Sequence, residues 1–276
     1  MLKISRSGFY AWQHQKPSRR EQSNKELVKQ MRQVHSHRHK RAYGSPRMTR
    51  ELNERGLACS ENRVARLMCE HQIRGRSRRP FRPRTTRVDS RAKASPNVLG
   101  KQGRPGRPGE QIVSDITYIP TREGWMYLTV VMDLFSRAIM GWDLSDSLAA
   151  GTVGRSLYKT MAWPWKPKKV IFHSDRGCQY TSHEVRKILS QICWTQSMSA
   201  KGYCYDNAFA ESFFASFKCE CLPESGIFES KLHARRAVFD YIETFYNRSR
   251  KHSGIDYLAP VKFLELYFEQ QNINMN

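Results

Sequence analysis

Three consecutive stretches near the middle of the chain are rich in apolar, β-branched and aromatic residues, and short polar turns separate them. They cover residues 111–119, 125–135 and 137–144. Runs of this composition and length are typical of β-strands, and turns this short join antiparallel neighbours. The pattern predicts an antiparallel meander of three strands.

Downstream of the meander, helical and strand-like patterns alternate. Helices are predicted over residues 148–162, 182–192 and from Asp206, the expected N-cap, and strands over 169–175 and 193–199. The resulting order, β-β-β-α-β-α-β-α, predicts an α/β fold in which helices flank a mixed five-stranded sheet.

Two short helices are predicted upstream of the meander. Ser45 is the expected cap of the first helix, with Pro46 in its first turn; Gly56 ends that helix and Ser60 caps the second. The second helix would bury Val64, Leu67 and Met68. The pair predicts a small all-α helix-turn-helix domain, with an exposed helix over residues 21–36 before it.

The formal net charge of +22 is concentrated in the first part of the chain. Residues 1–110 contain 28 Lys and Arg against 8 Asp and Glu, whereas residues 111–276 contain 19 against 17. Such a charge density attracts phosphates with little regard to sequence. Arg63 and Arg66, on the second predicted helix, are therefore candidates to face DNA. A helical hairpin with solvated arginines is an equally good interpretation of that pattern.

The seven cysteines include no CxxC pair, and their number is odd, which favours reduced thiols in a cytosol. His35, His37 and His39 precede Cys59 and Cys69, but the ten-residue cysteine spacing does not fit a zinc module of two His and two Cys. No apolar run is long enough to span a membrane, and no apolar signal-peptide core is present near the start. We therefore expect a soluble, cytoplasmic protein.

Three carboxylates carry the candidate chemistry. Asp115 lies inside the first predicted strand, Asp175 at the end of the fourth, and Glu211 in the last helix of the predicted fold. Phosphoryl-transfer sites with two Mg²⁺ or Mn²⁺ ions gather acidic oxygens from distant segments, and the predicted order would bring these three to one sheet edge. Three crowded acids would repel one another unless cations bound, so we expect metal dependence.

The helix of Glu211 has an apolar stripe and a polar face. The stripe consists of Ala210, Phe213, Phe214 and Phe217. Lys218 follows Glu211 by seven residues, about 10 Å along the same face, a position that suits a DNA phosphate. Beyond this helix, residues 230–247 predict a long amphipathic helix with Leu232 among its inward residues. A basic cluster of candidate phosphate contacts follows, namely Arg248, Arg250 and His252.

The acids lie in extended motifs: D-x59-D-x35-E, with HSDRGCQYTS around the second acid, DNAFAESFFASFK around the third, and YNRSRKHSGIDYLAP downstream. With these motifs the chain resembles the second-reading-frame (OrfB) transposases of bacterial insertion sequences, whose core is similar to retroviral integrase. The resemblance covers nearly the whole chain. It implies a ribonuclease-H-like fold and a catalytic, metal-binding triad of Asp115, Asp175 and Glu211 that uses Mg²⁺ or Mn²⁺ for end nicking and strand transfer. It also favours DNA as the partner of the helix-turn-helix.

The resemblance further implies that the chain binds double-stranded DNA, namely transposon ends and target. It also implies association with a first-reading-frame (OrfA) product, or fusion to it by frameshifting, and assembly into a homo-oligomer on DNA. The expected location is the bacterial cytoplasm, in association with the nucleoid. Related sequences usually have Trp at Ile112 and Arg at Ala200. The first departure should alter packing only, whereas the second would weaken a DNA contact.

A ribonuclease-H-like nuclease and a non-catalytic DNA-binding regulator are the alternative functions. The expected divisions are a helical segment 1–40, the helix-turn-helix 41–78, a basic linker 79–110, the core 111–222 and a helical extension 223–276.

Overall fold

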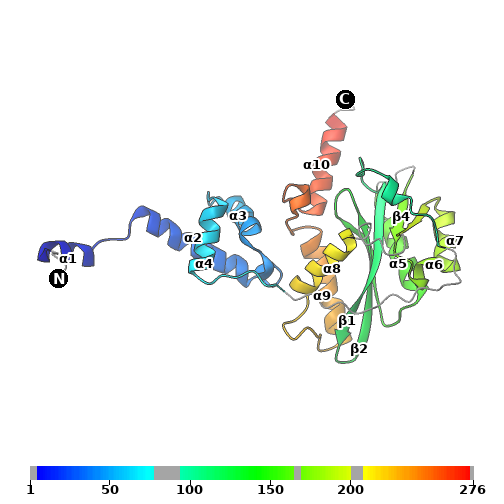
Figure 1. Ribbon diagram of the computed structural model, residues 1–276, viewed down its shortest axis with the longest axis horizontal. Helices are drawn as coiled ribbons and strands as arrows, with labels where there is room; N and C mark the ends of the chain where they lie inside the picture. Colours follow the sequence, from blue (N-terminus) through cyan, green and yellow to red (C-terminus); the bar gives the residue numbers. More distant parts are fainter. Residues whose placement is uncertain (1–4, 78–93, 165–168, 200–207, 274–276) are drawn as a thin grey trace. The chain divides into compact units, whose positions relative to one another are not determined.

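The computed structural model describes residues 5–77, 94–164, 169–199 and 208–273, with side chains to residue 271. The chain forms two compact units, Met1–Ser77 and Arg78–Asn276 (Figure 1). The predicted N-cap Asp206, Ala200, and much of the predicted linker lie outside the described residues.

The first unit is a small helical domain. Its elements are α1 Arg6–Gln13, α2 Arg19–Ser36, the 3₁₀ turn η1 Lys40–Ala42, α3 Ser45–Glu54 and α4 Glu61–Glu70. The buried stripe of α4 and the Ser60 cap are confirmed. Gly56, which was predicted to end the first of the two helices, follows α3 with a positive φ. The cap of α3 was predicted wrongly, because Gly44 takes the extended cap conformation and Ser45 is already helical.

Helix α2 is also not merely an exposed helix. It buries Leu27, Val28, Met31 and Val34. These residues complete the core of this unit together with Met48 and Leu52 of α3, because two short helices alone offer too little apolar surface to bury.

The second unit is built on a five-stranded sheet in the order β3-β2-β1-β4-β5. The strands are β1 Gln111–Thr121, β2 Gly124–Asp133, β3 Ile139–Ser145, β4 Ile171–Ser174 and β5 Thr195–Met198. The predicted antiparallel meander is confirmed, since β2 pairs with both β1 and β3 in antiparallel register. Strands β4 and β5 extend the sheet in parallel beside β1, so the predicted mixed sheet is confirmed too.

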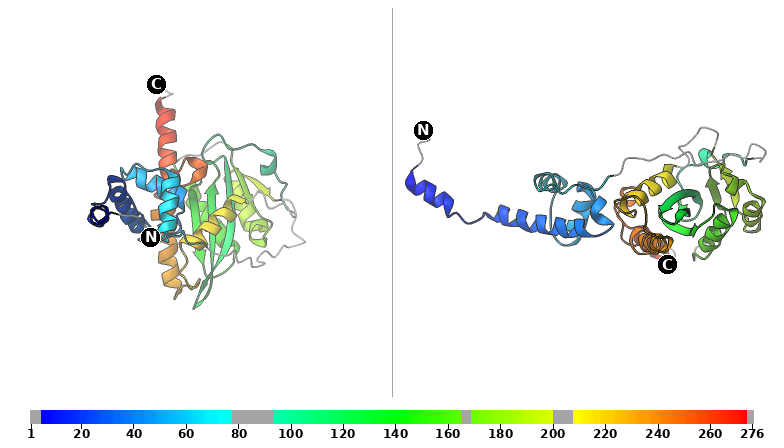
Figure 2. Two further views of the ribbon diagram at one scale, coloured as in Figure 1. Left: turned by 60° about the vertical axis from the view of Figure 1, so that its left-hand side comes forward. Right: turned by 90° about the horizontal axis from the view of Figure 1, so that it is seen from below.

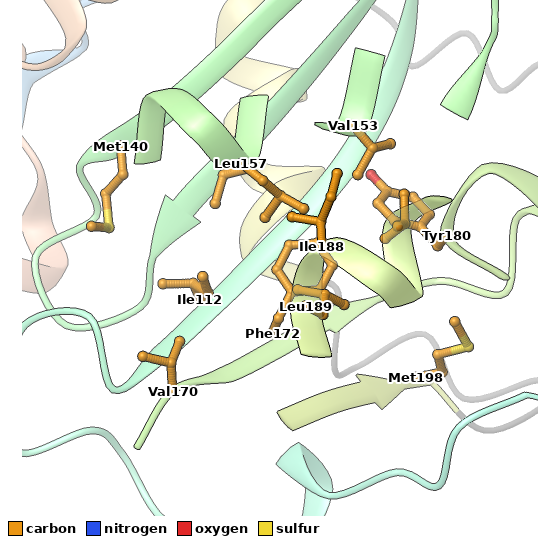
Figure 3. Close-up of a cluster of buried hydrophobic side chains, with 12 residues drawn as sticks. Ile112, Met140, Val153, Leu157, Val170, Phe172, Tyr180, Ile188, Leu189 and Met198 are labelled. Atoms are coloured by element: carbon orange, nitrogen blue, oxygen red, sulfur yellow. The ribbon is translucent and has the colours of Figure 1, made fainter. Parts of the chain in front are cut away.

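One face of the sheet is covered by α5 Ala150–Met161, α6 Cys178–Thr181 and α7 His183–Gln191 (Figures 1 and 2). A hydrophobic core cluster lies here, and Figure 3 shows side chains from β1, α5, β4 and α7 converging in it. Ile112 belongs to this cluster and is fully buried, so a different side chain at this position would change core packing. The short helix α6 was not predicted.

The opposite face carries α8 Ala208–Glu220, α9 Lys231–Phe239 and the π-helical segment η4 Asp240–Tyr246 (Figure 2). A further helix, α10 Pro260–Ile273, packs its Phe263 and Tyr267 rings on Phe135. Leu232 was predicted to point inward and is instead 57% exposed. The buried stripe of α9 begins at Ala234, and two residues correspond to about 200° around a helix, which places Leu232 on the outer face.

Candidate functional site

Two of the predicted acids lie at equivalent places on neighbouring strands. Strands β1 and β4 run parallel with Val113 beside His173, so Asp115 and Asp175 each follow a paired residue by two positions. Asp115 is inside β1, which continues past the end of β4, whereas Asp175 directly follows β4. Since alternate residues face opposite sides of a sheet and Ile112 faces α5, Asp115 faces the side of α8.

The turn after β4 fixes the Asp175 carboxylate. Its Oδ1 accepts a hydrogen bond from the backbone N–H of Gly177 at 2.9 Å. A Cβ atom on Gly177 would lie 3.0 Å from the same oxygen, closer than ordinary van der Waals contact. Gly177 is therefore needed for close approach rather than for an unusual φ, which is −57°.

The charges of both aspartates reach one buried side chain. Tyr180 of α6 is 1% exposed, and its hydroxyl is 2.9 Å from the Ser114 hydroxyl. Burial raises the pKa of the Tyr180 phenol well above its ordinary value, and the negative charges of Asp115 and Asp175 raise it further. The negative charges of the two carboxylates thus act on the same buried side chain, and they favour the neutral phenol form of Tyr180.

A buried histidine connects this turn to the strand beyond it. His173 Nδ1 lies 2.9 Å from the Ser197 hydroxyl, and Nε2 lies 3.0 Å from that of Ser199. The Ser197 oxygen already accepts the N–H groups of Val98 and Leu99, so its own hydrogen is directed to Nδ1. This pattern of hydrogen bonds assigns the acceptor role to Nδ1 and lets Nε2–H donate to Ser199.

Ser199 in turn holds both sides of the Asp175 turn. Its N–H donates to the carbonyl of Ser174, and its carbonyl accepts from Arg176 Nε at 2.8 Å. The main chain on either side of Asp175 is thus fixed by one buried residue next to β5.

Helix α8 presents the third acid and the predicted lysine. Glu211 lies exposed in its first turn, where the positive end of the helix dipole favours a carboxylate. Lys218 is half-buried, and burial lowers the pKa of its amine, an effect that the charge of Asp115 partly offsets. Lys218 therefore faces Asp115, and Glu211 is on the same helix face about 10 Å away along the axis.

Among the described residues, no three His, Cys, Asp or Glu side chains lie close enough together to hold a metal ion jointly. The strand register places Asp115 beside Asp175, and the charge of Asp115 reaches Lys218, whereas Glu211 does not complete a three-residue group with the two aspartates. The donor chemistry nevertheless fits Mg²⁺ or Mn²⁺, because both aspartates are hard oxygen donors whose charges act on the same point.

The two arginines predicted to face DNA differ in their surroundings. Arg66 is exposed and pairs with Glu70 of its own helix at 2.5 Å. Arg63 is half-buried and donates to Asn24 Oδ1 at 2.7 and 3.0 Å and to the Ser23 hydroxyl at 2.9 Å. Arg63 thus joins α4 to α2, whereas Arg66 remains on the surface.

The basic cluster after η4 is mostly internal. Arg248 is exposed, but Arg250 is 3% exposed and His252 9%. Both Glu220 oxygens accept from Arg250, and the Tyr246 ring lies edge-on to His252 with 4.7 Å between ring centroids. The prediction that Arg250 and His252 contact phosphates on the surface is therefore wrong for this structure. A guanidinium bound on both sides by a buried carboxylate has no fork left to offer a phosphate.

Sequence patterns had not marked Gly177, Tyr180 or Ser199 as parts of the site. The first two lie in the HSDRGCQY motif, so their position beside Asp175 was the available signal. Nothing in the sequence pattern distinguishes Ser199 from a surface serine.

Comparison with known proteins identifies the parts of the chain. An HTH-like domain matches residues 22–81, and two integrase core domain families match residues 105–204 and 193–260. Weak similarity extends to the HTLV-2 integrase catalytic core in complex with magnesium (13% identity, 56% of this chain and 96% of that one, TM-score 0.40) and the Mos1 mariner transposase catalytic domain (16%, 50% and 71%, TM-score 0.38). Among the described helices, none has the length and apolarity to cross a membrane.

Whole-chain relatives are bacterial insertion-sequence proteins. Transposase InsF for insertion sequence IS3A of Escherichia coli (strain K12) is 37% identical over 95% of this chain and 91% of its own length. The insertion element IS600 uncharacterized 31 kDa protein of Shigella sonnei is 36% identical over 96% of this chain and 97% of its own. Residues 22–81 and 105–260 thus match the two domains in order, and the five-stranded sheet with its flanking helices is the ribonuclease-H-like architecture of the core. The chain belongs to the family of IS3-type insertion-sequence transposases, DDE-class polynucleotidyl transferases with an integrase core and a helix-turn-helix-like domain.

Proposed function

We propose that this transposase nicks the ends of its element and joins the freed 3′-OH to a second DNA position, using Asp115, Asp175 and Glu211 as a catalytic triad. The observation that carries the proposal is the placement of Asp115 and Asp175 at matching positions of parallel strands, where their charges act on the same buried phenol.

The three carboxylates would hold two Mg²⁺ or Mn²⁺ ions, which when bound supply Lewis-acid activation of the attacking oxygen and stabilise the leaving one. The protein's own groups position these acids. The Gly177 N–H and Ser199 hold the Asp175 turn, and Tyr180, kept neutral, adds no further negative charge beside the two aspartates. Lys218, which faces Asp115, is placed to hold a phosphate next to the reacting one.

Residues 1–110, which include the first unit, would supply binding to the element's ends, since they contain 28 Lys and Arg against 8 Asp and Glu. Arg66 and Arg248 are the exposed candidates for phosphate contact. Partners would be double-stranded DNA, a first-reading-frame product or its frameshift fusion, and further copies of the chain, in the bacterial cytoplasm.

The test uses purified full-length protein, labelled end DNA and a divalent metal. Asp115→Asn, Asp175→Asn and Glu211→Gln should each abolish nicking and strand transfer while end binding persists, because each removes an oxygen ligand at nearly constant size. Glu184→Gln, an exposed acid on α7, is the matched control and should behave as the parent. Near-parental cleavage by any triad variant removes that residue from the proposal, and hydrolysis without joined product would favour a nuclease.

A further inference from the structure

The segment after η4 contacts the helix of Glu211 from inside the second unit. Arg250 donates from Nε to Glu220 Oε2 at 2.7 Å and from Nη2 to Glu220 Oε1 at 2.8 Å. Nη2 also donates to the Ser216 hydroxyl at 2.9 Å. We propose that Arg250 is a positioning residue that fixes the orientation of α8 and thereby the places of Glu211 and Lys218, an inference that rests on the proposed function.

Two contacts on one helix face define its rotation. Ser216 and Glu220 are four residues apart, about one turn, so a single guanidinium spans adjacent turns of α8. A helix with its side chains has a radius of about 5 Å, so a rotation of about 20° would move a side chain by nearly 2 Å. Displacements of about 1 Å at a catalytic centre can cost about 100-fold in rate. A small rotation of α8 would therefore move Glu211 far enough to lower the rate of the reaction.

The segment that carries Arg250 is itself fixed to the sheet. The Asn247 side chain accepts from the N–H of Ile139 at 2.9 Å and donates to its carbonyl at 3.0 Å. Ile139 begins β3, so Asn247 binds the segment to the far edge of the meander. The backbone N–H of Arg250 donates to Phe245, which keeps the guanidinium at a set distance from that anchor. Arg250 thus connects β3 with α8.

The ion pair of Arg250 and Glu220 is buried, and Glu220 accepts a further hydrogen bond besides those from Arg250. Arg250 and Glu220 are each 3% exposed, and the Tyr241 hydroxyl donates to Glu220 Oε2 at 2.8 Å. Replacing a buried ion pair by uncharged groups of similar volume is often nearly neutral for stability, whereas removing one partner alone is costly. The pair is therefore better suited to selecting one orientation than to supplying net stability.

The experiment compares two paired variants of the full chain. Arg250→Met with Glu220→Gln removes the ion pair but leaves an amide oxygen for the Tyr241 hydroxyl. The matched control, Arg155→Met with Asp143→Asn, removes another two-bonded arginine–carboxylate pair (3.1 and 2.8 Å), which joins α5 to β3 and does not touch α8. Each protein is assayed for kcat and KM on labelled end DNA, for Mn²⁺ affinity by calorimetry without DNA, and for thermal melting.

We expect the Arg250 and Glu220 double variant to melt cooperatively, to lose about tenfold or more in kcat with little change in KM, and to bind Mn²⁺ about threefold or more weakly. The control pair should retain the parental kcat and Mn²⁺ affinity. Arg250→Lys keeps the charge but lacks the fork that reaches both turns, so it should fold and lose kcat severalfold.

A folded double variant or Arg250→Lys protein with parental kcat and Mn²⁺ affinity would overturn the inference, as would an equal loss in the control pair. The proposed function is judged separately by Glu211→Gln. If that variant is inactive while the Arg250 variants match the parent, only the inference fails; if it is fully active, the triad and the inference fail together.

Discussion

A single methyl group at Gly177 tests whether the Asp175 carboxylate must keep its position. The added Cβ would be 3.0 Å from Asp175 Oδ1 and 3.0 Å from Gln179 Oε1. Both contacts are with side-chain oxygens that can rotate, and the φ of −57° suits alanine, so the backbone need not change. Gly177→Ala should therefore move the carboxylate by a few tenths of an ångström.

The effects on stability and on rate should then differ in size. Gly→Ala at a compatible φ stabilises by about 0.4–1 kcal/mol through the unfolded state. In the alanine variant, the tight contact with Cβ and a weakened hydrogen bond between residue 177 and Asp175 oppose this stabilisation by a similar amount, about 1 kcal/mol. The free energy of unfolding should therefore change by less than about 1 kcal/mol. The rate should fall more clearly. Since about 1 Å of misplacement can cost about 100-fold, a few tenths corresponds to roughly three- to tenfold in kcat.

The assay pairs urea unfolding with single-turnover nicking of end DNA. Gly254→Ala is the matched control, because a Cβ there meets nothing within 4 Å and the residue lies far along the chain from the triad. It should gain or keep stability and retain the parental rate. The reasoning is refuted if Gly177→Ala nicks at the parental rate, or if its loss of rate is matched by a loss of several kcal/mol in unfolding free energy.

Three further outcomes are expected. Lys218→Ala should weaken end binding and slow strand transfer. Mn²⁺ should bind at least as tightly as to the parent, because a positive charge that interacts with Asp115 is removed. An unchanged affinity for end DNA would mean that Lys218 has no role in DNA binding. Arg63→Ala should lower the unfolding free energy of the first unit by about 1–3 kcal/mol, whereas Arg66→Ala, an exposed pair, should cost less than about 1 kcal/mol; equal losses would contradict the contacts to Asn24 and Ser23. Residues 1–110 alone should bind duplex DNA with a log–log salt slope of about −0.9 for each phosphate neutralised, and a flat response between low and moderate salt would reject this assignment.

The fold was predictable where one periodic pattern extends over several turns or a whole strand. The meander, α5, α7 and β4 follow from such runs, because burial on one face imposes the period on the sequence. Helix α6 has four residues, too few to display a period, and was missed. Leu232 was placed wrongly because a leucine near the start of the helical run was assigned to the buried stripe of the helix. The residues that are buried there include the small Ala234 and Ala237.

The site was predictable only as far as residue type and strand position determine it. Asp115 and Asp175 come together because parallel neighbours bring matching positions to one edge, which the element order already implied. The hydrogen bonds that fix the main chain around Asp175 were not predictable. Ser199 reaches Asp175 through the Ser174 carbonyl and the His173 ring, across a strand pairing whose register no local pattern specifies.

Arg250 illustrates how a wrong interpretation of charge can be recognised from the sequence. Arg248 and Arg250 look alike as letters in YNRSRKH, yet one is exposed and the other buried. The missing signal lies in α8, where Glu220 continues the apolar stripe three residues after Phe217. A carboxylate on a core-facing stripe is too costly to bury unless a cation accompanies it, so Glu220 requires a basic partner from a distant segment. The structure identifies Arg250 as this partner, since its backbone N–H donates to Phe245 and its guanidinium donates to Glu220. The helix that carries the proposed catalytic acid Glu211 in its first turn is thus held near its other end by Arg250.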